Sequence, residues 1–316
     1  MADIVINHRC ATTKGAGGAW NRWDDVENGK MAWGEQAVVR GNPEYCGQGN
    51  DPTGDDFHAA PNIDHTQQFV QDDIIEWLRH LMGDVGFSTL RFDFTKGYGG
   101  EFVGKYVGGA GELAEFSIGE FWDTCSYDGS GLAYNQDGHR QRCVDWIDRT
   151  GGKSTAFDFT TKGVLQEACR RGEYWRLIDS QGKPPGLMGL WPSHAVTFLD
   201  NHDTGSTQAH WPFPGDKILQ GYAYILTHPG TPMVFWDHVF DWGDKVSGPL
   251  TAMVEARRKM DVHSRSKVEI INASDQFYAA ITDNKLAMKI GHGDWSPGAG
   301  WDVAASGDQF CVWTKA

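Results

Sequence analysis

Apolar positions along this chain follow two spacings, and their alternation predicts the elements of an α/β fold. Between Thr66 and Met82 the apolar side chains recur at helical spacing, which predicts an amphipathic helix. Apolar runs that end in polar residues predict buried strands, at 3–7, 90–98, 116–123, 154–159 and 195–203. Because strand, helix and strand form the repeating unit of a parallel sheet, the pattern predicts parallel strands with helices between them.

The remaining stretches extend this layout. Further helices are predicted at 139–148, 162–169, 220–227 and 250–260, and a last parallel strand at 232–236. The Gly-rich stretch 98–114 predicts a frayed helix and loop, and 179–192 predicts a loop. Beyond Val262, short alternating runs separated by Asp, Asn and Gly turns predict a small antiparallel sheet.

Three of the predicted parallel strands carry a carboxylate towards their ends, namely Asp93, Glu120 and Asp203. In a parallel (β/α) barrel, catalytic groups lie at the C-terminal ends of several strands. The three residues therefore have the layout expected of a carboxylate-based active site.

The first two carboxylates have different surroundings. Period-two alternation puts Arg91 and Asp93 on one face of their strand, and the guanidinium favours an ionised Asp93 that can act as a nucleophile. Glu120 stands among aromatic residues, a setting that tends to raise a carboxyl pKa towards the value a general acid needs. A purely structural Arg–Asp pair is the alternative for Asp93.

Composition narrows the classes of partner. The net charge of -14 argues against nucleic-acid or anionic-membrane partners, whereas neutral sugars remain possible partners. The 14 Trp offer flat faces that can stack on sugar rings. The six cysteines form no CxxC pair, so they predict neither a zinc framework nor a dense disulfide scaffold. No apolar run reaches the length of a membrane span, and the first residues do not resemble a signal peptide.

The stretch from Arg9 to Asp64 is rich in Gly, Asn, Asp and Trp and is too long for an ordinary loop. Its last part, 51–64, carries closely spaced oxygen ligands in a loop with Gly and Pro, which suits a hard cation. A solvated acidic loop is the alternative interpretation.

Four motifs in order resemble the signature regions of the α-amylase family of glycoside hydrolases. They lie at 3–8 (Asp-Ile-Val-Ile-Asn-His), 91–93 (Arg-Phe-Asp), 119–122 (Gly-Glu-Phe-Trp) and 198–203 (Phe-Leu-Asp-Asn-His-Asp). The runs 201–208 and 221–232 resemble the plant and green-algal branch of that family.

The resemblance implies a (β/α)8 TIM-type barrel that is incomplete at its amino-terminal side, because the family's first two strand–helix units have no counterpart here. The implied parts are the third barrel strand (1–8), an irregular calcium-binding excursion (9–64), the remainder of the catalytic barrel (65–262) and a C-terminal antiparallel β domain (263–316).

The activity that the resemblance implies is retaining endo-hydrolysis of α-1,4-glucosidic bonds in starch. Asp93 would be the nucleophile, Glu120 the general acid and base, and Asp203 the residue that stabilises the transition state. Substrate-binding roles would fall to five further residues: His8, Arg91, Lys96, Trp122 and His202. Of these, Arg91 would also keep Asp93 ionised.

The resemblance also implies bound Ca²⁺. One ion would be held by the Asn7 side chain, a carboxylate near Asp51, the Asp55 carbonyl, Asn62 and the Gly97 carbonyl. A second ion would use Asp56, Phe57 and Ala60. Two departures from the plant pattern predict weaker calcium binding. Asp51-Pro52 stands where the family has Pro-Asp, and Asn62 replaces a family aspartate.

Two other functions stay open. The chain is alternatively a truncated, catalytically inactive glucan-binding relative, because barrel closure needs the strands without a counterpart here. A related transglycosylase or branching-type enzyme is a second alternative, which the plant-like runs argue against. The expected partner is starch or a malto-oligosaccharide, and the expected state is a monomer. Family members are secreted or plastidial, and the sequence does not decide the compartment of this chain.

Overall fold

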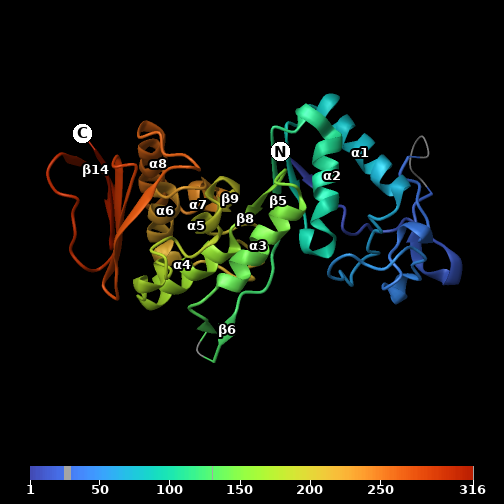
Figure 1. Cartoon of the computed structure of the whole chain (residues 1–316), viewed down its shortest axis with the longest axis horizontal. Helices are drawn as coiled ribbons and strands as arrows, with labels where there is room; N and C mark the ends of the chain where they lie inside the picture. The colour runs from blue at the N-terminus through green and yellow to red at the C-terminus, as the bar shows by residue number, and fades with distance from the viewer. Residues whose placement is uncertain (25–29, 130, 316) are drawn as a thin grey trace. The chain divides into compact units, whose positions relative to one another are not determined.

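The computed structural model describes residues 1–24, 30–129 and 131–315, drawn in Figure 1. The chain divides into two compact units. The first unit comprises 1–123 and 145–156, and the second comprises 124–144 and 157–316. The helix α3 (Asp137–Arg149) and the strand β8 (Thr155–Phe157) lie across these divisions.

Parallel strands form the sheet of the first unit. β1 pairs with β4, β4 with β5, and β5 with the first residues of β8, all in parallel. The register places Asp3 opposite Arg91. Short buried runs produce these strands, which are β1 (Ala2–Ile4), β4 (Thr89–Phe92) and β5 (Phe116–Gly119).

Two helices of the first unit, α1 (Gln68–Gly83) and α2 (Gly100–Ala110), pack side by side (Figure 1). α1 buries Val70, Ile74 and Leu78 completely, one per helical turn, as the apolar spacing predicts. The prediction of an amphipathic helix between Thr66 and Met82 is thus confirmed.

The excursion between β1 and α1 is mostly irregular. It contains the short antiparallel pair β2 (Thr13–Lys14) and β3 (Trp20–Arg22). Two buried tryptophans, Trp23 and Trp33, form its small core. The Arg9 guanidinium lies 5.1 Å from the ring of Trp23 and 5.3 Å from that of Trp33.

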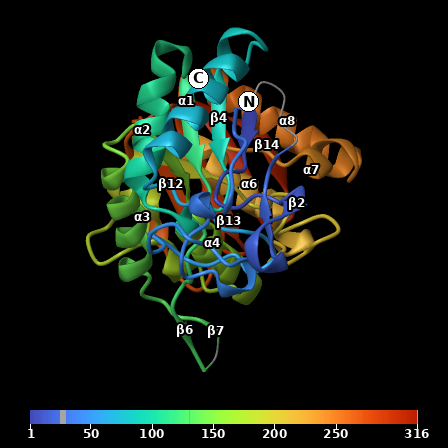
Figure 2. The same ribbon diagram turned by 90° about the vertical axis from the view of Figure 1, so that its right-hand side faces the viewer.

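The second unit continues the alternation of strands and helices, and β9 pairs with β10 in parallel. Its elements are α4 (Phe159–Arg171), α5 (Leu187–Leu190), β9 (Ala195–Thr197), α6 (Ile218–Thr227), β10 (Thr231–Pro232), α7 (Trp236–Phe240) and α8 (Asp244–Lys259). A hairpin of β6 (Tyr127–Asp128) and β7 (Gly131–Leu132) projects from this unit (Figure 2).

The second unit ends in the expected antiparallel sheet, which confirms that prediction. Its strands follow the order β11-β12-β13-β15-β14, and the sheet packs against α6 and α8 (Figure 1). The strand bounds are β11 (Val268–Ala273), β12 (Phe277–Thr282), β13 (Leu286–Gly291), β14 (Trp301–Gly307) and β15 (Phe310–Lys315).

Some predicted boundaries were wrong. The last parallel strand, expected at 232–236, is β10 at 231–232, and α7 already begins at Trp236. The helix expected within 98–114 is present as α2 at 100–110, and it is regular because Val103, Tyr106 and Val107 bury one face of it. The predicted loop 179–192 contains α5. In the part of the chain that the structure describes, no helix is long and apolar enough to span a bilayer.

Candidate active site

The ends of β4 and β5 bring Asp93 and Glu120 to one edge of the first unit's sheet. Backbone hydrogen bonds continue just past the strands, from Asp93 N–H to the Ile4 carbonyl (3.0 Å) and from Glu120 N–H to the Phe92 carbonyl (2.9 Å). Phe94 then turns the chain in a left-handed conformation with φ of 45°. Its N–H donates to Glu120 Oε2 at 3.2 Å, so this turn itself positions the carboxyl group.

Arg91 joins carboxylates that belong to three neighbouring strands or follow them directly. Its Nη1 donates to Asp93 Oδ1 and to Asp3 Oδ1, each at 2.7 Å. Its Nη2 lies 2.9 Å from Glu120 Oε1. The side chains of Arg91 and Glu120 are buried, whereas that of Asp3 is 58% exposed. One planar guanidinium thus gathers both residues that the sequence assigns to the chemistry.

The electrostatics of this cluster follow from its geometry. Burial lowers the pKa of Arg91, but the carboxylates of Glu120, Asp3 and Asp93 outweigh it and raise the pKa above its usual value. Arg91 is therefore a permanent cation. The aromatic surroundings that the sequence suggested for Glu120 are only part of its environment, because an ion pair at 2.9 Å also holds it.

His8 lies near this cluster. Its ring stacks on the ring of Phe57 with centroids 3.8 Å apart and meets Phe94 edge-on at 6.4 Å. Burial lowers the pKa of His8, and the charge of Asp93 only partly opposes this. At neutral pH His8 is therefore a neutral imidazole that can either donate or accept a hydrogen bond.

Lys96 and Trp122 follow the two carboxylates along the chain. The Lys96 ammonium lies 5.4 Å from the ring of Phe94 and 3.7 Å from Asp55 Oδ2. Trp122 comes two residues after Glu120 and is half-buried. Both belong to the first unit, as do His8, Arg91, Asp93 and Glu120.

Asp203 and His202 belong to the second unit, where they follow β9. Asp203 Oδ2 lies 3.4 Å from His202 Nε2, and Asp203 Oδ1 accepts a hydrogen bond from Gln208 Nε2 at 2.8 Å. The Asn201 side chain holds the turn, because its Oδ1 accepts the N–H groups of Asp203 (3.0 Å) and Thr204 (2.8 Å).

Some of the predicted calcium ligands lie together. Asn7 Nδ2 donates to Asn62 Oδ1 at 3.4 Å, and Asn62 Nδ2 donates to Asp56 Oδ1. An added Cβ on Gly97 would lie 2.0 Å from Asn7 Oδ1, so the Gly97 backbone closely approaches that oxygen. Amide, carbonyl and carboxylate oxygens are the ligand types that Ca²⁺ prefers, and these residues fit it in kind. With one carboxylate among them, the charge of the ligand set is low.

The remaining predicted ligands make other contacts. The side chain of Asp51 is 80% exposed and pairs with Arg40 at 3.5 Å. Asp55 is expected to use its carbonyl, and its N–H donates to the Lys96 carbonyl at 2.9 Å. Phe57 donates its N–H to Asn62 Oδ1 at 3.2 Å, and Ala60 is buried. Among the described residues, no group of three or more His, Cys, Asp or Glu side chains could hold a metal ion.

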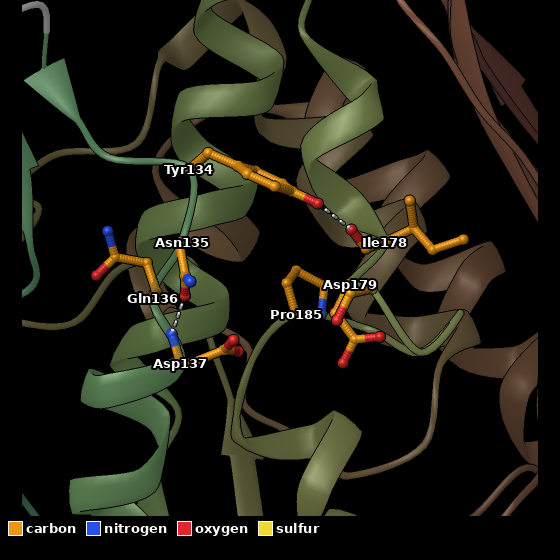
Figure 3. A pocket seen from close by; sticks show the side chains of 8 residues that line it. Tyr134, Asn135, Gln136, Asp137, Ile178, Asp179 and Pro185 are labelled. Atoms are coloured by element: carbon orange, nitrogen blue, oxygen red, sulfur yellow. Dashed lines mark hydrogen bonds between the residues drawn. The ribbon is translucent and has the colours of Figure 1, made fainter.

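A pocket of the second unit is built from other residues (Figure 3). The Tyr134 hydroxyl donates to the Ile178 carbonyl at 3.0 Å across one side of it. Asp179 and Asp137, which also line it, both pair with Arg140, at 2.9 and 2.7 Å. Both carboxylates are thus engaged in ion pairs with Arg140, and none of the predicted site residues lines this pocket.

Sequence reasoning assigned no site role to Asp3 and only a metal-ligand role to Phe57. The parallel register that sets Asp3 opposite Arg91 is the missing signal, because it appears only once strands are paired. The stacking of Phe57 on His8 joins residues 49 positions apart in an irregular segment, where no periodic pattern could have revealed it.

Comparison with known proteins gives a consistent result. Residues 259–314 match the alpha-amylase C-terminal beta-sheet domain. The chain is 56% identical over 318 residues to the probable alpha-amylase 2 of Arabidopsis thaliana, covering 100% of this chain and 74% of that relative. It is 50% identical over 317 residues to the chloroplastic alpha-amylase 3 of the same plant, covering 99% of this chain but 35% of that relative.

The fold agrees with solved structures. An alpha-amylase from Malbranchea cinnamomea superposes with a TM-score of 0.67 over 99% of this chain and 73% of the other, at 14% identity. That likeness shows the fold alone, whereas the identity to the Arabidopsis relatives extends over essentially the whole chain. The chain belongs to the α-amylase family of glycoside hydrolases.

Proposed function

We propose that this chain hydrolyses internal α-1,4-glucosidic bonds of starch and related malto-oligosaccharides with retention of configuration. The observation that carries the proposal is the gathering of Asp93 and Glu120 on the guanidinium of Arg91, at the ends of adjacent parallel strands. The reaction class is inferred from membership of the family. The cluster contains the two carboxyl groups that a retaining mechanism needs.

In the first step, the Asp93 carboxylate attacks the anomeric carbon while Glu120 gives its proton to the departing glycosidic oxygen. The bond between that carbon and oxygen breaks, and a glycosyl ester of Asp93 forms. In the second step, Glu120 takes a proton from water, the water oxygen attacks the anomeric carbon, and Asp93 leaves as a carboxylate. The Arg91 guanidinium donates to the Asp93 carboxylate before the attack and can do so again once Asp93 has left the sugar.

The other predicted residues act on the sugar. The neutral His8 would hydrogen-bond to a sugar hydroxyl, as would His202, and Asp203 would stabilise the positive charge that develops on the ring. Lys96 and Trp122 would line the side of the leaving group. His8 has limited freedom, because Phe57 and Phe94 pack against its ring.

An inactive glucan-binding protein is the other candidate. It is not favoured, because Asp93, Glu120 and Asp203 are all present and the relatives that match the whole chain are amylases.

The test is release of reducing ends from soluble starch by the purified chain and its Asp93→Asn variant. We expect hydrolysis by the wild type and a loss of at least about 10³-fold in the variant, because an amide cannot form the glycosyl ester. Asp84→Asn, the same change at an exposed position that ends α1, is the matched control and keeps full activity. Full activity in Asp93→Asn, or no hydrolysis by folded wild type, contradicts the proposal.

Weak calcium binding by Asn7, Asp56, Asn62 and the Gly97 carbonyl is the second part of the proposal. Bound there, the ion would link the end of β1 to the excursion. Removing the only carboxylate in this set lowers its charge, so Asp56→Asn is expected to reduce the rise in melting temperature that calcium chloride causes. Asp51→Asn, whose carboxylate faces Arg40, is expected to keep that rise. Equal shifts in both variants would argue against this ligand set.

A further inference from the structure

The loop that follows β9 is fastened at both ends by one buried carboxylate, that of Asp200. Asp200 Oδ1 accepts the Thr204 hydroxyl at 3.0 Å, near the start of the loop. Its two oxygens accept the N–H of Phe213 at 3.1 and 3.2 Å, at the far end. Gly205 lies so close that an added Cβ would be 2.9 Å from Asp200 Cβ. Any displacement of Asp200 therefore moves both ends of the loop.

Beneath this loop lies a lysine that is completely buried. Lys162, on α4, donates from Nζ to the Leu199 carbonyl at 2.7 Å and to Gln166 Oε1 at 2.9 Å. The same ammonium lies 3.4 Å from Asp200 Oδ1 and 4.9 Å from the ring centroid of Trp211. Its partners thus come from its own helix, from the start of the loop and from the end of the loop.

A buried ion pair is a poor explanation of stability by itself. Removing two charges from water costs about as much as their attraction returns, and an apolar pair of similar volume is often equally stable. A better-supported use of such pairs is to specify one conformation among several. The conformation specified here is that of the loop in which Asn201 Oδ1 holds the N–H of Asp203.

We propose that Lys162 and Asp200 are positioning residues that hold the loop carrying His202 and Asp203 in the geometry used for hydrolysis. The effect on catalysis rests on the proposed function. The effect on the loop does not, because it concerns only contacts within the second unit.

The charge state of this cluster changes at alkaline pH. Burial lowers the pKa of Lys162 to about 8, although Asp200 opposes the shift. The other titratable groups that face Asp200 are His238, whose Nε2 lies 3.7 Å away, and Tyr222, which bonds to His238 at 2.8 Å. Burial lowers the pKa of His238 and raises that of Tyr222, so both are neutral between pH 7 and 10. In that range Lys162 is the member of the cluster that loses its charge.

Loss of the Lys162 charge at alkaline pH does not destabilise the folded chain. The pKa of Lys162 is lower in the folded chain than the usual 10.5 of an unfolded one, so the unfolded chain binds more protons between pH 8 and 10.5. The contribution of Lys162 to the free energy of unfolding therefore increases with pH in this window. Unfolding driven by Lys162 cannot explain a decrease in kcat there.

The experiment uses Lys162→Met, Asp200→Asn and the double variant Lys162→Met/Asp200→Asn. Each single variant leaves one buried partner without its counterpart and is expected to lower the melting temperature. The double variant removes both charges with little change in volume, so it remains folded. Lys217→Met, which removes an ammonium paired with Asp216 at 3.5 Å, is the matched control.

Two readouts separate the inference from the proposed function. The first is hydrogen exchange of the peptide covering 199–213, expected to be at least about 10-fold faster in the double variant than in wild type or Lys217→Met. The second is kinetics on malto-oligosaccharides, with kcat reduced about 10- to 100-fold and KM within about threefold, as expected when catalytic groups are misplaced. The wild type is expected to show an alkaline decrease in kcat near pH 8 that the double variant lacks.

The outcomes are distinct. A folded double variant with wild-type exchange in 199–213 overturns the inference, and so does one with wild-type kcat and alkaline profile. A wild-type chain that hydrolyses no glucan contradicts the proposed function, whereas faster loop exchange in the double variant still supports the positioning of His202 and Asp203.

Discussion

At the scale of single residues, Arg91 shows what a sequence reveals and what it omits. Alternation along the strand correctly placed Arg91 beside Asp93, and the contact is 2.7 Å long. The same pattern could not show that Asp3 and Glu120 share this guanidinium, because those contacts depend on strand pairing. The expectation for Glu120 was incomplete for the same reason. Lys162 was expected on a helix, but its burial depends on contacts with a loop 37 or more residues away.

The geometry predicts that Arg91→Lys impairs catalysis without abolishing folding. Lysine keeps the charge but offers one nitrogen in place of a planar fork with two, so it cannot reproduce the contacts of Nη1 to Asp3 and Asp93 and of Nη2 to Glu120. We expect kcat on soluble starch to decrease about 10- to 100-fold, with a small change in KM. Arg149→Lys, at an exposed position on α3, serves as the control and keeps wild-type kcat. Equal kcat values in both variants would show that the fork geometry is unimportant.

At the scale of elements, the existence of helices and strands was easier to predict than their ends. Apolar spacing gave α1 and the C-terminal strands, because burial of one face dictates both patterns. The strand expected at 90–98 stops at Phe92, because Phe94 turns left-handed there and Gly97 ends a short 3₁₀ helix. The turn contacts Asn7 through Gly97 and the excursion through the Lys96 carbonyl, which accepts the N–H of Asp55, and the local sequence does not specify these contacts.

Gly97 tests how tightly this turn is packed. A Cβ at this position would lie 2.0 Å from Asn7 Oδ1, and Asn7 is almost completely buried. Gly97→Ala is therefore expected to lower the free energy of unfolding in urea by about 1–3 kcal/mol. For Gly83→Ala, at the end of α1, an added Cβ meets nothing within 4 Å, and we expect a change within about 0.5 kcal/mol. Stability of Gly97→Ala equal to that of Gly83→Ala would show that the turn has room to adjust.

At the scale of the whole molecule, each of the two units buries a neutral histidine. The net charge of -14 gives no indication of these buried groups. In the first unit, His65 contacts the Tyr106 hydroxyl at 2.6 Å and the Ile6 carbonyl at 3.0 Å. In the second unit, His228 contacts the Tyr278 hydroxyl at 2.8 Å and so ties α6 to β12. Burial lowers the pKa of His65 to about 4 and that of His228 to about 3. Composition indicates only that histidines are present, because burial depends on the assembled fold.

These histidines predict that the chain loses stability in acid well before most of its carboxylates are protonated. An unfolded histidine has a pKa of about 6.5, so below that pH the unfolded chain binds protons that the folded chain excludes. The free energy of unfolding therefore decreases as pH falls from about 6.5 towards 4, by up to roughly 3 kcal/mol for each histidine. The His228→Gln variant lacks one of the groups that bind a proton on unfolding. It is therefore expected to flatten the dependence of the free energy of unfolding on pH, whatever the effect of the substitution on stability at pH 7. His80→Gln, an exposed histidine paired with Asp84, is expected to leave the dependence unchanged. Urea unfolding at several pH values measures both slopes, and an unaltered slope in His228→Gln would mean that His228 already carries a proton in the folded chain.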